Sequence, residues 1–403
     1  MGNQLNVSGP QSKLEHTSEA GQILIDPVRG TKKLEPVGKV SSHMALFLPS
    51  LGGGGAERVM VVLANGLAER GHLVDLVLAK AEGPYLAQVR DEVRIVDLGS
   101  RRVAFSLPGL VRYLRRERPA SLLSALIHAN VIACRAHRLA RVPTRLVVSE
   151  HNYRSGSRPQ NFHGRLVLWL MRGTYPWADA VVAVSHGVAD DLVRNFGLAP
   201  DLVHVIYNPV VDDTLLSKAQ APLEHPWFVE GAPPVILGVG RLMEQKDFPT
   251  LIRAFARVRA QCAARLMILG EGELRPQLEA LVRELGLQDD VALPGFAENP
   301  FAYMARAAVF VLSSRWEGFG NVLVEAMACG CPVVSTDCPS GPCEILEGGK
   351  WGRLVPVGDV DALAAAISAT LDETAQPDVR VPAGTFNVER AIAEYLAIMR
   401  PDQ

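Results

Sequence analysis

The sequence lacks several features that would decide its class at once. None of its apolar runs reaches the roughly 18 residues that a membrane-spanning helix needs, so we expect no transmembrane segment. The first residues lack the apolar core of a signal peptide, and no Ser or Thr stands where a myristoylation motif requires one after Gly2. The formal net charge is −2, without the basic excess of a typical nucleic-acid-binding protein. These absences favour a cytoplasmic protein that binds no nucleic acid.

Cysteine is also scarce, and its spacing is not that of a zinc site. Four of the six cysteines lie within residues 329–343 in the pattern C-x-C-x6-C-x4-C, which contains no C-x2-C pair. Cys331 precedes Pro332 and an apolar pair that is typical of a buried strand. We therefore expect reduced thiols that fill the core, as in a reducing cytoplasm, and no metal. The six are Cys134, Cys262, Cys329, Cys331, Cys338 and Cys343.

The remaining composition is that of a globular protein with two domains. Apolar residues make up 48% and charged residues 21%, which excludes a chain disordered throughout. The 403 residues exceed one domain of about 100–200 residues. Residues 41–215 carry a formal charge of +5 and residues 216–403 carry −8, which indicates halves with different partners. Residues 1–40 are polar, and we expect them to form a poorly ordered tail.

Strand and helix signals alternate through the first half of the chain. An apolar run at residues 44–48 is followed by Gly52–Gly55, by a helical stretch that ends at Gly71, and by an apolar run at 74–78. This order is that of a strand–helix–strand unit with parallel strands. Further strands are expected at residues 93–98, 121–126, 145–149, 180–184 and 203–206.

A second alternating series follows the Pro-rich residues 216–232, which we interpret as a linker. Its strands are expected at residues 235–239, 266–269, 291–293, 309–312, 333–335 and 354–356, and its helices at 251–260, 274–285, 300–307, 321–328, 360–371 and 388–399. Two such series predict an α/β fold with two doubly wound, Rossmann-like domains, 41–215 and 216–387, that face a cleft. Ligands of such sheets bind at the carboxyl ends of the strands.

The first candidate site is the glycine-rich loop at Gly52–Gly55. Between a strand and a helix, the backbone N–H groups of Gly54 and Gly55 can approach a phosphate. The loop is not a P-loop, because no Gly-Lys-Ser/Thr follows, and its glycine spacing is not that of a dinucleotide-binding fold. The alternative interpretation is a mobile turn.

Two basic residues follow the first strand of the second series. Arg241 and Lys246 stand five residues apart in a loop at a strand's carboxyl end, where they can converge on one diphosphate. The alternative is a solvated loop with an ion pair.

Residues 315–326 form the most specific pattern. Glu317 lies in a glycine-containing loop after a strand, Asn321 suits the start of the next helix, and Glu325 lies one turn inside it. The Glu317 carboxylate can accept hydrogen bonds from sugar hydroxyls, and N–H groups near Gly320 and Asn321 can bind phosphate. Glu325 can reach a ribose diol. The alternative is that both glutamates only cap a helix.

Further candidates follow other strands. His151 stands at the carboxyl end of a first-series strand beside Glu150, where an imidazole can reach a ligand in the cleft; the alternative is a structural histidine. Gly270, Gly295 and Phe296 follow second-series strands and can line a nucleotide pocket.

Six arginines between Arg101 and Arg118 surround the apolar positions of one helical stretch. This pattern fits either a solvated helix face or a surface that docks on an anionic membrane. The six are Arg101, Arg102, Arg112, Arg115, Arg116 and Arg118.

Together the ordered motifs resemble retaining glycosyltransferases of family 4, which use nucleotide-sugar donors and have the two-domain GT-B architecture. The resemblance covers residues 44–400 and rests on GGGGAERV (52–59), SEHN (149–152), GRLMEQKD (240–247), EGFGNVLVE (317–325) and residues 341–344. GGGGAERV and residues 341–344 resemble the motifs of enzymes that build bacterial surface or lipid-linked glycans with UDP-N-acetylhexosamines. The sequence departs at Cys343, where relatives often carry a basic residue.

The resemblance implies a role for each motif. Arg241 and Lys246 would bind the donor diphosphate, Glu325 would hold the ribose, and Gly54 and Gly55 would lie near the phosphate.

The remaining roles also follow from the resemblance. Glu317, with the backbone of Phe319, Gly320 and Asn321, would hold the donor sugar and phosphate, and His151 would lie by the anomeric centre.

The same resemblance implies how the two domains divide the reaction. The first domain would bind the acceptor, a glycan or a polyprenyl-diphosphate-linked sugar at the cytoplasmic face of a membrane, and residues 388–403 would pack back on it. The second domain would bind the donor. The departing phosphate oxygen would take the acceptor proton, and cationic side chains would make a divalent metal or other cofactor unnecessary.

Two other functions remain open at this point. A nucleotide-sugar epimerase of the same architecture would need acid and base carboxylates around the sugar but no acceptor. A non-catalytic sugar-nucleotide-binding protein would have lost Glu317, Lys246 or Arg241, and all three are present. A dehydrogenase is disfavoured because the dinucleotide fingerprint is missing.

Overall fold

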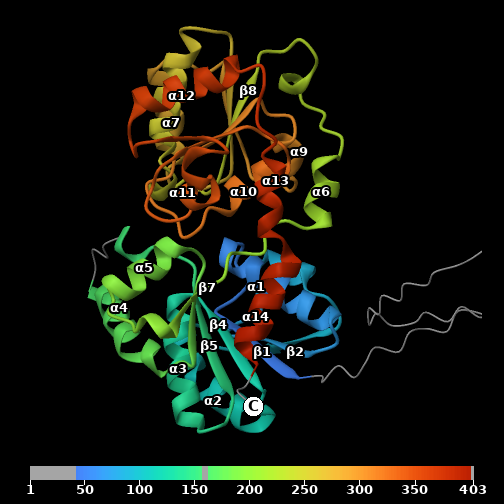
Figure 1. Ribbon diagram of the computed structural model, residues 1–403, viewed down its shortest axis with the longest axis vertical. Helices are drawn as coiled ribbons and strands as arrows, with labels where there is room; N and C mark the ends of the chain where they lie inside the picture. Colours follow the sequence, from blue (N-terminus) through green and yellow to red (C-terminus); the bar gives the residue numbers. More distant parts are fainter. Residues whose placement is uncertain (1–41, 157–161, 401–403) are drawn as a thin grey trace, which may run out of the picture. The chain divides into compact units, whose positions relative to one another are not determined.

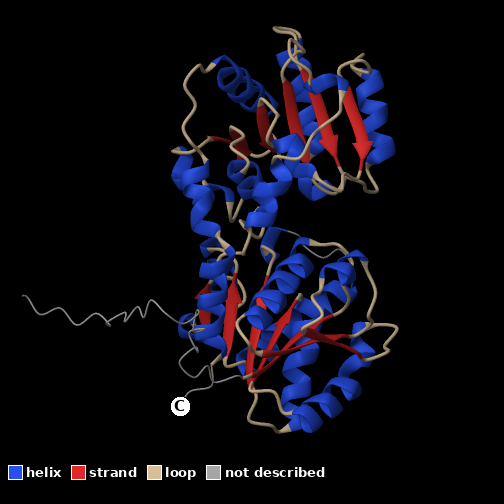
Figure 2. Cartoon of the chain, turned by 90° about the vertical axis from the view of Figure 1, so that its right-hand side faces the viewer, coloured by secondary structure: helices blue, strands red, loops and turns tan. Residues whose placement is uncertain are grey.

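The computed structural model describes residues 42–156 and 162–400, so the predicted tail of residues 1–40 lies outside the described residues. The described residues form two parallel sheets, one of seven strands and one of six. Helices lie on both faces of each sheet (Figures 1 and 2). We call the first sheet with its covering helices the N-lobe and the second the C-lobe. This architecture confirms the predicted pair of parallel α/β domains.

The N-lobe sheet has the strand order β3-β2-β1-β4-β5-β6-β7. Its strands are β1 (His43–Leu48), β2 (Leu73–Leu78), β3 (Val93–Asp97), β4 (Ser121–Ala125), β5 (Arg145–Glu150), β6 (Ala180–Ala183) and β7 (Val203–Val205). Its helices are α1 (Gly55–Glu69), α2 (Leu107–Glu117), α3 (Ile127–Ala140), α4 (Phe162–Thr174), α5 (His186–Arg194) and, from the end of the chain, α14 (Val388–Met399).

The C-lobe sheet has the order β10-β9-β8-β11-β12-β13. Its strands are β8 (Val235–Val239), β9 (Arg265–Leu269), β10 (Val291–Gly295), β11 (Val309–Leu312), β12 (Val333–Thr336) and β13 (Arg353–Val355). Its helices are α6 (Asp213–Ala219), α7 (Phe248–Arg259), α8 (Arg275–Glu284), α9 (Pro300–Met304), α10 (Asn321–Ala328), α11 (Pro342–Ile345), α12 (Val360–Asp372) and α13 (Arg380–Ala383).

Helices cover both faces of each sheet, so the central strands carry apolar side chains on both faces. Along β1, Met44 and Leu46 pack into the layer of α1 and α14, whereas Ala45 and Phe47 pack into the opposite layer. Successive side chains of a strand point to opposite faces, which explains this division. A continuous apolar run therefore indicated a central strand correctly.

The last helix, α14, packs on the N-lobe rather than on the lobe that precedes it in sequence (Figure 1). A Cβ at Gly66 of α1 would lie 2.1 Å from Cδ1 of Ile392, so this glycine lets the two helices approach closely. Tyr395 of α14 shares a hydrogen bond of 3.2 Å with the hydroxyl of Ser149, which connects the helix to β5.

One expectation about the linker was wrong in its first residues. Residues 216–219 continue α6 instead of forming irregular chain. The helix begins at an N-cap, where the Asp212 side chain accepts a hydrogen bond of 2.7 Å from the Leu215 N–H. Its end is stabilised by Arg306, which donates to the Ala219 carbonyl over 3.3 Å. The Asp cap is a local signal that could have predicted this helix.

The strand orders place two pairs of loops where ligands of doubly wound sheets bind. In the N-lobe, β1 lies between β2 and β4, and in the C-lobe, β8 lies between β9 and β11. At these two positions the loops that follow neighbouring strands run to opposite faces of the sheet, which leaves room for a ligand between them. The loops after β8 and β11, which carry Lys246 and Glu317, therefore meet at the same edge. Among the described residues, no helix is long and apolar enough to cross a membrane.

We predict that Gly66→Val destabilises the protein because its side chain collides with Ile392, at a cost of about 1–3 kcal/mol. Thermal unfolding measures the effect. Gly173→Val is the matched control, since Gly173 is a helical glycine with no atom within 4 Å of a Cβ placed there. Shortening the opposing side chain in Gly66→Val/Ile392→Ala should recover part of the loss; equal losses at Gly66 and Gly173 would contradict the packing explanation.

Candidate active site

The centre of the candidate site is an ion pair between the two loops at the C-lobe switch point. The Lys246 ammonium lies 2.6 Å from Oε1 of Glu317, and the two side chains are only 15% and 8% exposed. The Ser314 hydroxyl donates to the same carboxylate oxygen over 2.6 Å. A largely buried carboxylate thus has a cation and a hydroxyl as partners, which offsets its desolvation.

Hydrogen bonds to backbone carbonyls hold these two loops together. The Arg315 N–H donates to the Gln245 carbonyl over 2.8 Å, and the Ser313 hydroxyl donates to the Lys246 carbonyl over 2.7 Å. The Gln245 amide donates to the Trp316 carbonyl over 2.9 Å. The position of Lys246 against Glu317 is therefore fixed by these three hydrogen bonds and not by the ion pair alone.

Arg241, the predicted partner of Lys246, takes no part in this ion pair. Arg241 is exposed, and the described residues give its guanidinium no hydrogen-bond partner. Glycine is favoured at position 240 because the Lys246 side chain folds over it. A Cβ there would lie 3.2 Å from Cε of Lys246. The structure thus places Lys246 in the site and leaves the guanidinium of Arg241 free for a ligand.

A second ion pair joins the lobes at the other predicted glutamate. Nη1 of Arg58 in α1 lies 2.6 Å from Oε1 of Glu325 in α10, and the Glu325 side chain is 7% exposed. The Arg58 guanidinium also lies over the ring of Phe301, 5.4 Å from its centre. Sequence reasoning included Arg58 in the glycine-rich motif but assigned it no role.

The glycine-rich loop and the start of α10 also approach each other. A Cβ at Gly55 would lie 3.6 Å from Nδ2 of Asn321, and Oδ1 of Asn321 accepts a hydrogen bond of 2.8 Å from Asn208. At Gly54 the Glu57 carboxylate folds back over the backbone, 2.4 Å from a Cβ placed there. The two predicted phosphate-binding segments are therefore neighbours, although a carboxylate covers Gly54.

His151 stands where the N-lobe meets the loop that contains Glu317. Its Nε2 lies 3.0 Å from the Ser149 hydroxyl. Burial, and after it the positive charge of Arg154, lower the pKa of His151 to about 4, so the imidazole is neutral near pH 7. Its neighbour Glu150 is fully buried and accepts hydrogen bonds from Arg154 and Tyr175, which makes it part of the scaffold.

The backbone of the two lobes touches beside His151. A Cβ at Gly318 would lie 1.9 Å from the His151 carbonyl oxygen, so only glycine fits between Glu317 and Phe319. The Gly318 carbonyl accepts hydrogen bonds of 2.7 Å from the hydroxyls of Ser185 in the N-lobe and Ser340 in the C-lobe. This contact brings His151 and the Glu317 loop to one place, as expected from their positions at strand ends.

Comparison with known proteins identifies the family. A model described as Glycosyltransferase Family 4 matches residues 53–214, and one described as Glycosyl transferases group 1 matches residues 233–373. A Campylobacter jejuni protein is 34% identical over 342 residues, which cover 82% of this chain and 90% of that protein. It is named N-acetylgalactosamine-N,N'-diacetylbacillosaminyl-diphospho-undecaprenol 4-alpha-N-acetylgalactosaminyltransferase. The chain belongs to glycosyltransferase family 4.

Other relatives agree with this assignment. The lipopolysaccharide core biosynthesis glycosyltransferase LpsE of Rhizobium meliloti is 29% identical over 362 residues, which cover 86% of this glycosyltransferase and 96% of LpsE. Sucrose-phosphate synthase of Thermosynechococcus elongatus has a TM-score of 0.75 at 22% identity, covering 89% of this chain and 98% of that one. HepE of Anabaena, solved with UDP and glucose, has a TM-score of 0.71 at 23% identity. The match covers 88% of this chain and 99% of HepE. These structural likenesses show that the fold is GT-B.

Glu344 of this glycosyltransferase has a function in the fold that sequence reasoning left undefined. Its two carboxylate oxygens accept hydrogen bonds of 2.8 Å from the backbone N–H groups of His186 and Gly187, the first residues of α5. A carboxylate is favourable at a helix N-terminus, where N–H groups lack partners within the helix. A C-lobe side chain thus caps an N-lobe helix, while the neighbouring Cys343 is exposed.

For several residues that were predicted to bind the donor, local packing or backbone conformation also explains the residue type. Gly270 has φ +137°, and a Cβ there would lie 2.0 Å from the Gly240 carbonyl oxygen. Gly295 has φ +97°, with the Glu271 carboxylate 2.7 Å from a Cβ. The ring of Phe319 is buried between Tyr207 and Phe386, so only its backbone is available to a ligand, whereas Phe296 is 79% exposed. Gly270 thus packs against Gly240, the residue that the Lys246 side chain covers.

The His, Cys, Asp and Glu side chains were compared with what a metal site requires. Within residues 42–156 and 162–400, no three His, Cys, Asp or Glu side chains converge as metal ligands. The sequence contains one Asp-x-Asp pair, but Asp359 caps α12 and Asp361 forms an ion pair with Arg257. Burial raises the pKa of Cys338 to about 12, which keeps this thiol protonated.

We predict that the His151 imidazole titrates with a midpoint near pH 4 instead of the usual value near 6.5. Because the folded pKa lies below the unfolded one, the stability that His151 contributes is present above about pH 6.5 and is lost as the pH falls towards 4. Histidine proton resonances followed against pH measure the midpoint, and the signal missing in His151→Gln identifies the residue. A midpoint above 6 would show that the imidazole is not enclosed.

Proposed function

We propose that this protein is a retaining, metal-independent glycosyltransferase. It transfers a hexosyl or N-acetylhexosaminyl group from a nucleoside-diphosphate sugar, UDP-linked in our proposal, to a glycan or a lipid-linked sugar in bacterial glycoconjugate synthesis. The observation that carries the proposal is the meeting of Lys246, Glu317 and His151 where the strand ends of both lobes come together. The N-acetylgalactosaminyltransferase of Campylobacter jejuni, whose name specifies a diphospho-undecaprenol-linked acceptor, supports the substrate class.

The C-lobe supplies groups for each part of a nucleotide-sugar donor. Arg241 and Lys246 provide positive charge for the diphosphate, as a guanidinium fork and a point charge. Lys246 has three donors and uses one on Glu317, which leaves others for phosphate oxygens. Glu325 accepts hydrogen bonds from the ribose hydroxyls, and Glu317 accepts them from the donor sugar.

The reaction needs no group with an extreme pKa. The bond between the sugar C1 and the phosphate oxygen breaks, and C1 bonds to the acceptor oxygen on the same face. The proton of the acceptor hydroxyl moves to the departing phosphate oxygen. Lys246, Arg241 and backbone N–H groups stabilise the negative charge on the leaving diphosphate, so no metal is required. The His151 imidazole, which is neutral, and the Glu317 carboxylate orient the donor sugar.

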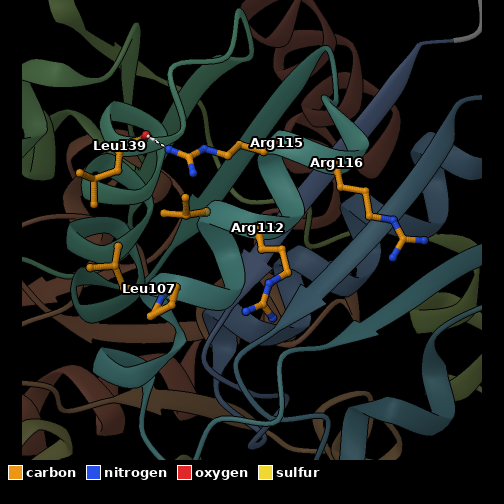
Figure 3. A pocket seen from close by; sticks show the side chains of 7 residues that line it. Leu107, Arg112, Arg115, Arg116 and Leu139 are labelled. Atoms are coloured by element: carbon orange, nitrogen blue, oxygen red, sulfur yellow. Dashed lines mark hydrogen bonds between the residues drawn. The ribbon is translucent and has the colours of Figure 1, made fainter.

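The acceptor side of the proposal rests on the N-lobe and its basic helix. Beside α2 and the end of α3 lies a hollow of about 700 Å³ (Figure 3). Arginine and apolar side chains line it together, and Arg115 donates a hydrogen bond of 2.8 Å to the Leu139 carbonyl. The lining residues are Leu107, Pro108, Val111, Arg112, Arg115, Arg116 and Leu139. Such a surface suits anionic lipid headgroups above an apolar layer, and it supports a peripheral position on the cytoplasmic face of a membrane.

Donor and acceptor assays separate the proposal from an epimerase. With UDP- and GDP-sugars and a polyprenyl-diphosphate-linked sugar, we expect transfer that depends on the acceptor and persists in excess EDTA. Nuclear magnetic resonance of the product reports whether the anomeric configuration is retained. Interconversion of the donor sugar without an acceptor would favour the epimerase, and binding without turnover would favour a non-catalytic protein.

We predict that Glu317→Gln lowers kcat/KM for the donor roughly 10- to 100-fold, because a charged hydrogen-bond acceptor for the sugar is lost. Initial rates at varied donor concentration measure the change. Glu284→Gln, an exposed change at the end of α8, is the control and should leave the rate unaltered. Full transfer rate and donor affinity in Glu317→Gln would show that this carboxylate does not hold the donor.

The membrane proposal makes a separate prediction. The triple change of Arg112, Arg115 and Arg116 to Gln should weaken sedimentation with vesicles rich in phosphatidylglycerol, at about 1 kcal/mol per arginine near the surface. The matched control changes three exposed arginines on other helices, Arg194, Arg253 and Arg283, to Gln. Equal binding by both triples would assign the arginines of α2 to an ordinary solvated face.

A further inference from the structure

We propose that Arg58, a residue of the acceptor lobe, is a positioning residue for the donor: it fixes the Glu325 carboxylate so that this carboxylate can bind the ribose. The inference rests on the proposed function, which gives Glu325 the ribose. It adds a residue from the opposite lobe to a donor site that is otherwise built by the C-lobe.

The contacts of Glu325 carry the first step. Arg58 holds one carboxylate oxygen, Oε1, at 2.6 Å, and the described residues give the Glu325 side chain no other hydrogen-bond partner. The second oxygen is therefore available to hydroxyl donors. A carboxylate that is 7% exposed and lacks a cation would bear its desolvation cost alone, so Arg58 determines whether this group stays in place.

The position of Arg58 itself is well defined. It lies in the first turn of α1, directly after the glycine-rich loop, where its N–H donates to the Gly54 carbonyl over 3.1 Å. Its guanidinium lies over the ring of Phe301, which is buried in the C-lobe. A guanidinium combines a flat face for an aromatic ring with N–H donors at its edge, so one side chain satisfies both contacts.

A consequence for binding follows from the place of the two partners. Glu325 belongs to α10 of the C-lobe, and Arg58 belongs to α1 of the N-lobe. The ribose-binding group is thus complete only when the lobes are in contact at this point. Donor affinity then depends on a residue that touches no part of the donor.

The test uses the full-length protein and nucleoside diphosphates as probes. Calorimetry first establishes whether UDP or GDP binds the wild type; if neither binds, both the proposed function and this inference fail. The tighter of the two is then compared with its 2′,3′-dideoxy form in wild type, Arg58→Ala, Arg58→Lys, Glu325→Gln and Arg58→Ala/Glu325→Gln. Arg70→Ala is the matched control, because Arg70 follows the same helix and pairs with Glu389 away from the site.

We expect Arg58→Ala to weaken binding of the ribonucleotide roughly 10- to 100-fold, the range for a charged hydrogen bond. Binding of the dideoxy form should change little, because it lacks the hydroxyls that Glu325 holds. Arg58→Lys should recover part of the affinity, and the double variant should bind no more weakly than Glu325→Gln alone. Arg70→Ala should bind as the wild type does.

Three results would overturn the inference while leaving the proposed function in place. Arg58→Ala could bind the ribonucleotide with wild-type affinity. Arg58→Ala could lose affinity by the same factor for the ribonucleotide and for its dideoxy form. That result would place Arg58 on the diphosphate or in a purely structural contact between the lobes. The double variant could lose the sum of the two single effects, which would mean that Arg58 does not act through Glu325.

Discussion

The enclosed ion pair of Lys246 and Glu317 is the constraint on which the site depends. Two opposite charges, each mostly removed from water, are stable only when the loops that carry them stay together. These loops leave neighbouring strands, β8 and β11, in opposite directions, so the pair lies where a doubly wound sheet has room for a ligand. The strand order of the C-lobe therefore determines the chemistry at its edge.

From this centre the site extends across the boundary between the lobes. Gly318 lets the Glu317 loop lie directly against the His151 carbonyl, and Arg58 reaches Glu325 from the first turn of α1. Each contact joins residues more than a hundred positions apart in sequence. These contacts bring the strand ends of both lobes together at one place.

Much of this could be predicted from the sequence, because strands covered on both faces are apolar throughout and their ends carry polar loops. The loop positions of Lys246, Glu317 and His151 follow from that pattern, and the two-lobe fold with them. Arg58 and Glu344 were not assigned, because their partners, Glu325 and the start of α5, are distant in sequence and no local pattern connects them. Gly270 and Gly295 were predicted to bind the donor, and the structure adds a conformational reason for each glycine: both have positive φ, Gly270 lies against the backbone of Gly240, and Gly295 lies against the Glu271 carboxylate.

The cap that Glu344 places on α5 has a consequence for the contact between the lobes. Unlike the Lys246–Glu317 pair, this half-buried carboxylate and the N–H groups of His186 and Gly187 can each be hydrated when they separate. A hydrogen bond to a charged group contributes about 1.5–3 kcal/mol, and water replaces it when the contact opens. The lobes are therefore joined here by a contact that can open without leaving a buried charge unpaired, in contrast to the ion pair at the centre of the site.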